Sequence, residues 1–206
     1  MLKKLLVGSV LLSTSLVSQA GIIDTMNGAQ LQGISVTALF GDGASEQFSW
    51  VATNLDSGGV IGTGWSLSLS GSTFGEIDNT DPLNPVTFGG WELVNDTVDA
   101  GIVGLSIDAG IAGVYFDTLD DAEYTAGSNV GRFFAEETGN ATATYADSFS
   151  NIDLFGTLNI EWSQAIGVNS ETVFLTDTDI ATVSEPATAL VFLSGLLALV
   201  NFRRKS

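Results

Sequence analysis

Apolar and polar residues alternate with a period of two through most of the central part of this sequence. In residues 65–70 a tryptophan and two leucines alternate with three serines, and in residues 154–162 Leu154, Gly156, Leu158, Ile160 and Trp162 share one face. Successive side chains of a strand point to opposite faces of a sheet, whereas a helix repeats every 3.6 residues. The pattern therefore predicts half-buried β-strands.

Other stretches show the same alternation and are separated by Gly, Asn and Asp residues, which favour turns. The further candidate strands are residues 34–40, 47–52, 91–94, 103–107, 114–116, 142–149 and 172–175. The glycine-rich residues 58–64 are predicted to form a bend or a bulge. About eight to ten short strands at this spacing predict an all-β fold, an antiparallel β-sandwich of the immunoglobulin-like or jelly-roll-like kind. A small barrel is the alternative.

The N-terminal segment has the three parts of a secretory signal peptide. Two lysines follow Met1, an apolar run covers residues 5–17, and small residues precede a cleavage site between Ala20 and Gly21. We expect residues 1–20 to form a helical signal peptide that signal peptidase removes during export.

The C-terminal segment, residues 184–206, also has three parts. Ser184, Glu185 and Pro186 come first, and Pro186 suits the first position of a helix. An apolar stretch and a basic tail follow. The stretch includes Ala189, Leu190, Val191, Phe192, Leu193, Leu196, Leu197, Leu199 and Val200, and the tail contains Arg203, Arg204 and Lys205. A spanning helix needs about 20 residues, so this stretch predicts a short transmembrane helix, with its basic end in the cytoplasm.

An acidic residue and proline, a short apolar helix and an Arg-rich end together resemble the PEP-CTERM sorting signal. Glu185 and Pro186 match the last two positions of its Pro-Glu-Pro motif, and Ser184 departs from the first. Residues 91–95, 153–158 and 177–179 loosely resemble segments of other exported proteins of this class. The resemblance implies a Gram-negative host that makes exopolysaccharide and processing by an exosortase. It also implies a transient anchor in the inner membrane before transfer to the cell surface or extracellular matrix.

The segment between these ends, residues 21–183, is strongly acidic. Arg132 is its only basic residue against 23 acidic residues, a formal net charge of −22. Nucleic acids are excluded as partners, because their binding requires Lys and Arg to neutralise phosphates. The chain has no His or Cys, and its few Lys lie at the two ends, so most nucleophile, general-base and zinc chemistry is missing. We expect no enzyme, with a carboxylate-pair glycosidase as a weak alternative.

Calcium is the one cofactor that the acidic residues suggest, because calcium prefers carboxylate oxygens and extracellular calcium sites can be weak. Runs of charge are more often solvated faces, and no EF-hand loop is present. The candidate ligands are Asp117, Asp120, Asp121, Glu123, Asp177 and Asp179, with a further group at Glu76, Asp78 and Asp81.

Glycan binding would use exposed aromatic side chains. Each of the four tryptophans, Trp50, Trp65, Trp91 and Trp162, shares strand parity with apolar neighbours, which predicts that they lie in the core. The sequence therefore favours an exported, surface-sorted structural or interaction protein of the cell envelope or exopolysaccharide matrix. The alternative is a calcium-dependent or carbohydrate-binding module.

Overall fold

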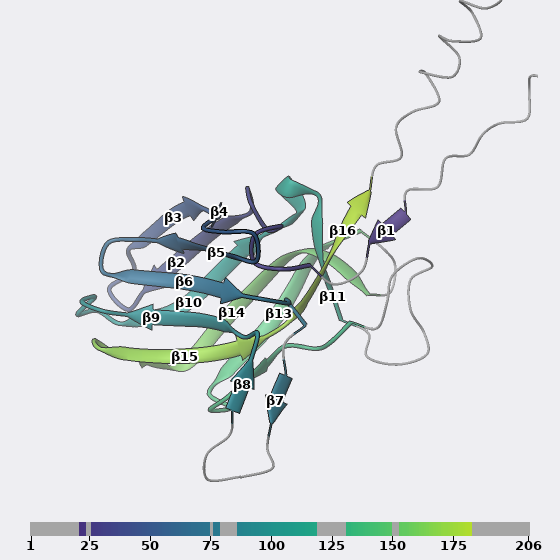
Figure 1. Cartoon of the computed structure of the whole chain (residues 1–206). Helices are drawn as coiled ribbons and strands as arrows, with labels where there is room; N and C mark the ends of the chain where they lie inside the picture. Colours follow the sequence, from purple (N-terminus) through teal and green to yellow (C-terminus); the bar gives the residue numbers. More distant parts are fainter. Residues whose placement is uncertain are drawn as a thin grey trace, which may run out of the picture. The chain divides into compact units, whose positions relative to one another are not determined.

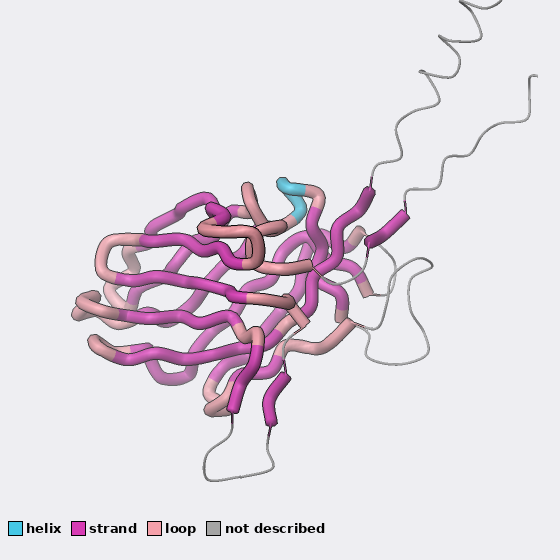
Figure 2. The backbone as a smooth tube through the Cα atoms, viewed as in Figure 1, coloured by secondary structure: helices cyan, strands magenta, loops and turns pink. Residues whose placement is uncertain are grey.

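The structure, a computed structural model, describes residues 21–23, 26–74, 76–78, 86–118, 131–149 and 153–182. Residues 22–182 form one compact unit. The predicted signal peptide and sorting segment lie outside the described residues. Within those residues strands dominate, and the only helix is the 3-10 turn η2 (Gly110–Ala112), as Figure 2 shows. The predicted all-β class is confirmed.

The strands form two main sheets and one small hairpin (Figure 1). The larger sheet has the order β1 (Gly21–Ile23), β16 (Asp177–Thr182), β11 (Val114–Asp117), β14 (Leu154–Ile166), β10 (Ile102–Asp108), β2 (Ser35–Phe40) and β3 (Ser45–Ser49), and β13 (Ala141–Ser148) also pairs with β14. The smaller sheet has the order β12 (Ala135–Glu136), β15 (Ser170–Leu175), β9 (Trp91–Asn95), β6 (Trp65–Ser70), β5 (Ser57–Ile61) and β4 (Val51–Ala52). The hairpin pairs β7 (Glu76–Asp78) with β8 (Val86–Phe88).

The larger sheet contributes rows of apolar side chains to the core. Ala38, Leu105 and Ile160 lie opposite one another on β2, β10 and β14, and all three are buried. Residues directly opposite in an antiparallel pair share a face. The register therefore joins the alternating patterns of strands far apart in the sequence into one apolar surface.

The smaller sheet covers that surface with aromatic side chains. Trp91 is fully buried, stacks on Phe174 at a ring-centroid distance of 5.8 Å and meets Trp50 at 5.2 Å. Buried residues of both sheets belong to one hydrophobic cluster. Two open antiparallel sheets around one core favour the β-sandwich over the barrel. The predicted core position of all four tryptophans is confirmed, since none is more than 6% exposed.

For residues 47–64, the prediction of one strand over 47–52 is wrong, and the predicted bend within 58–64 is confirmed only at residues 63–64. The alternating run 47–52 is not one strand but two, because the chain crosses from β3 in one sheet to β4 in the other. Trp50 fixes this crossing: its amide donates to the Ile34 carbonyl at 2.8 Å, and its indole Nε1 donates to the Gly28 carbonyl at 2.7 Å. Part of the glycine-rich stretch is strand β5, where a Cβ on Gly58 would overlap the Trp50 indole.

Candidate functional site: a buried acidic cluster

The last strand, β16, brings acidic residues from separate parts of the sequence together. It lies beside β11 (Figure 1) and pairs with it. In this register Asp177 lies opposite Asp117 and Asp179 lies opposite Tyr115. Residues two apart on a strand share a face. Asp117, Asp177 and Asp179 therefore project from the same side of the two-stranded ladder, and each is only 1% exposed. We call these three residues the acidic cluster.

Neighbouring segments hold the acidic cluster in place. The Thr73 hydroxyl donates to Oδ1 of Asp177 at 3.1 Å, and the Thr73 amide donates to the Met26 carbonyl at 2.8 Å. Met26 is tied to β16 in turn, because its amide donates to the carbonyl of Thr178 at 3.2 Å. The cluster therefore depends on a segment about 100 residues away in the sequence.

The only basic residue of the unit lies beside the cluster. The Arg132 amide donates to the Asp117 carbonyl at 3.1 Å. Its guanidinium donates to the Phe74 carbonyl and lies 4.9 Å from the centre of the Phe74 ring. A Cβ on the preceding residue, Gly131, would overlap the Asp117 carboxyl group, so a side chain there would displace that carboxyl.

Burial changes the acid–base behaviour of the cluster. Removal from water, together with the negative charges of Asp179 and Asp117, raises the pKa of Asp177 to about 8. The hydrogen bonds from Thr73 and from the Thr178 amide act in the opposite direction. Burial disfavours the charged form of a carboxyl group, and neighbouring carboxylates disfavour it further. Asp177 is therefore mostly protonated at neutral pH, and a cation that bound to its carboxyl group would have to displace that proton.

The structure brings together some of the predicted calcium ligands and not others. Asp117, Asp177 and Asp179 come from two different predicted groups and share one face. Asp120, Asp121, Glu123 and Asp81 lie outside the described residues, and Glu76 and Asp78 belong to the separate β7–β8 hairpin. Within the part of the chain that the structure describes, no three acidic side chains are arranged to hold a metal ion.

Two buried polar residues close to these strands are not among the residues predicted from the sequence. Asp153 is fully buried, and its carbonyl accepts hydrogen bonds from the amide and the hydroxyl of Thr118, each at 3.1 Å. Thr73 is also fully buried. Asp153 directly precedes the alternating strand β14, and this position could have indicated from the sequence that it lies near the core. No local pattern in the sequence indicates that Thr73 is buried.

The predicted sorting residues Ser184, Glu185 and Pro186, the apolar stretch from Ala189 and the basic tail lie outside the described residues. Among the residues that the structure does describe, no helix is long and apolar enough to cross a membrane. Comparison of the chain with protein-family models, with curated proteins and with solved structures finds no match.

Proposed function

We propose that this chain is an exported, surface-sorted structural or interaction protein of the cell envelope or exopolysaccharide matrix. Signal peptidase and an exosortase-type enzyme would process its two ends. The finer features of the proposal are a helical signal peptide, a short C-terminal transmembrane helix and an immunoglobulin-like or jelly-roll-like sandwich between them. The sandwich would be the exported part and would act without catalysis.

One observation carries this proposal. The compact unit, residues 22–182, begins two residues after Ala20 and ends two residues before Ser184. Its first strand, β1, and its last strand, β16, are neighbours in one sheet. Removal of both terminal segments would therefore leave every strand of the sandwich with its partners.

The experiment compares processing in the native host. The double variant Glu185→Ala/Pro186→Ala should keep its C-terminal residues and stay with the membrane. The wild-type protein outside the cell should have an intact mass that lacks residues 1–20 and Arg203–Ser206. The flanking double variant Val183→Ala/Thr188→Ala is the matched control and should be processed like wild type. Unchanged mass and distribution in the motif variant would contradict the proposal.

The acidic cluster favours a second candidate function, a calcium-dependent binding module. The three carboxyl groups are not arranged as a metal site in the described residues, but a cation near the buried, directly opposed Asp117 and Asp177 would reduce the repulsion between them. The acidic cluster itself does not suit the glycosidase alternative, because a catalytic carboxyl pair has to flank a sugar bond and these three side chains are closed to solvent.

A further inference from the structure

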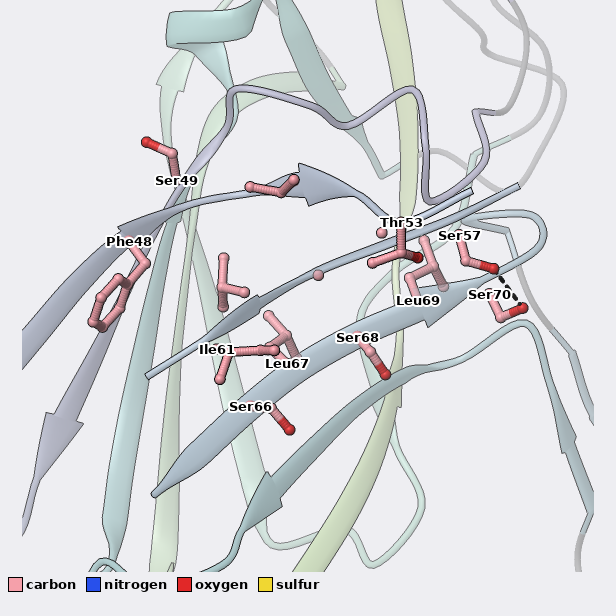
Figure 3. A pocket seen from close by; sticks show the side chains of 14 residues that line it. Phe48, Ser49, Thr53, Ser57, Ile61, Ser66, Leu67, Ser68, Leu69 and Ser70 are labelled. Atoms are coloured by element: carbon pink, nitrogen blue, oxygen red, sulfur yellow. Dashed lines mark hydrogen bonds between the residues drawn. The ribbon is translucent and has the colours of Figure 1, made fainter. Parts of the chain in front are cut away.

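The outer face of the smaller sheet contains a hollow of about 590 Å³ over β4, β5 and β6 (Figure 3). Val51, Gly59 and Ser68 lie opposite one another on these three strands. The central position is therefore occupied by a residue without a side chain. On either side of this row, Ile61 lies opposite Ser66 and Ser57 lies opposite Ser70. The hollow forms because Gly59 is surrounded by larger residues on the same face.

The lining of this hollow is uncharged. Its side chains are small hydroxyl-bearing residues, aliphatic residues and one phenylalanine, and none is acidic or basic. The same face becomes acidic on the next strand, where Glu92 lies opposite Ser68. In a unit with a net charge of −22, this neutral surface does not suit a cation, and the surrounding charge repels an anion.

Two kinds of group project into the hollow. Figure 3 shows Ser66 and Ser68 on one side of β6, with Leu67 and Leu69 on the other, and the Ser57 hydroxyl donates to the Ser70 hydroxyl at 3.0 Å. Val51 and Ile61 are 59% and 81% exposed. Each hydroxyl can both donate and accept a hydrogen bond, and the aliphatic groups offer apolar contact beside them.

An aromatic ring completes the lining. Phe48 is 37% exposed and contacts Trp65 edge to face at a ring-centroid distance of 6.2 Å. Trp65 is itself held by a hydrogen bond from its indole nitrogen to Glu46 at 2.8 Å. The phenyl ring therefore contacts a buried tryptophan while part of the ring faces solvent. Such a ring can pack against the apolar C–H face of a pyranose.

We propose that the hollow over β4, β5 and β6 binds a neutral glycan. A sugar without charged groups would place its C–H faces on Phe48, Val51 and Ile61 and its hydroxyl groups against the serines. Binding pockets for small ligands have volumes of roughly 300–1,000 Å³, with an apolar lining and a few polar groups that set orientation. The inference deepens the proposed function by naming a partner class for an exported interaction protein.

The test measures how polysaccharides retard the protein in native gels. The probes are dextran, hydroxyethylcellulose and galactomannan as neutral polymers and alginate as an anionic polymer. The protein is used as the host produces it, either from outside the cell or from membranes in a zwitterionic detergent. Failure of the proposed sorting then changes where the protein is found but does not prevent the binding measurement.

We expect at least one neutral polymer to retard the protein and alginate to have no effect. The variants Ser66→Ala/Ser68→Ala and Ile61→Ser should each weaken retardation at least fivefold. The control Thr142→Ala/Thr144→Ala removes two exposed hydroxyls from β13 and should bind like wild type. Absence of retardation by all three neutral polymers, equal retardation by alginate, or insensitivity to the two hollow variants would overturn the inference. The inference would also be overturned if the protein bound the uncharged dye Nile red but none of the polymers. That result would indicate a site for an apolar ligand.

Discussion

Asp117 and Asp177 lie directly opposite each other in the antiparallel pair of β11 and β16, and both side chains are 99% withdrawn from solvent. Like charges at directly opposed positions destabilise a sheet. The pair is tolerated because Asp177 accepts a hydrogen bond from Thr73 and is protonated at neutral pH. This relationship predicts that the stability of the fold depends on pH and on cations.

The first prediction concerns pH. The pKa of Asp177 is raised to about 8 in the folded protein, whereas an aspartate in the unfolded chain titrates near 3.9. The folded state therefore holds the extra proton between these values. Its stabilising effect is complete below about pH 4 and is lost as the pH rises through 8. The free energy of unfolding of wild type should fall by on the order of a few kcal/mol between pH 5 and pH 8.5. The melting temperature should fall over the same range.

The variant Asp177→Asn removes this titration. It should flatten the dependence of melting temperature on pH and should be more stable than wild type at pH 8.5. The control Asp99→Asn changes an exposed aspartate and should follow the wild-type curve. Parallel curves for wild type and Asp177→Asn would contradict the prediction.

The second prediction concerns calcium. At constant ionic strength, millimolar calcium chloride should raise the melting temperature of the protein. The rise should be larger at pH 8.5 than at pH 6, because calcium competes with the proton on Asp177. Asp177→Asn/Asp179→Asn should abolish the response, and the exposed pair Asp96→Asn/Asp99→Asn should leave it intact. A melting temperature that does not respond to calcium at either pH would rule out the calcium-dependent function.

The third prediction concerns salt. Residues 21–183 carry a net charge of −22, and such self-repulsion opposes the compact state. Raising sodium chloride from 0.01 M to 0.15 M shortens the screening length from about 30 Å to about 8 Å, so the melting temperature should rise. Glu136→Gln/Glu137→Gln should reduce this rise, and Thr142→Ala/Thr144→Ala should not. An equal response in all three proteins would show that these two carboxylates do not contribute.

The fourth prediction concerns the core. Trp91 contacts both Trp50 and Phe174 and is fully buried. Trp91→Ala should lower the free energy of unfolding by about 3–5 kcal/mol, because it leaves a large cavity. Urea denaturation followed by circular dichroism measures this change. Phe133→Ala is the control, since that ring is 56% exposed, and a loss as large as that of Trp91→Ala would contradict the assignment of the core.

Most strands could be predicted from the sequence because their two faces meet different environments. The runs that became β2, β6, β9, β10 and β14 alternate, and most of their apolar residues are buried. Strands β5 and β16 were not predicted from the sequence, for two different reasons. Strand β5 contains two glycines, and β16 has buried aspartates and threonines where an apolar pattern would be expected.

The sequence by itself determined the all-β class, the core position of the four tryptophans and the strong acidity of the central part. These properties follow from local alternation and from composition. Tertiary structure alone decided that Asp117 faces Asp177, that Trp50 crosses between the sheets and that Gly59 lies at the centre of a neutral hollow. Each depends on the register of strands that are distant in sequence, and register is set by how whole apolar faces fit together.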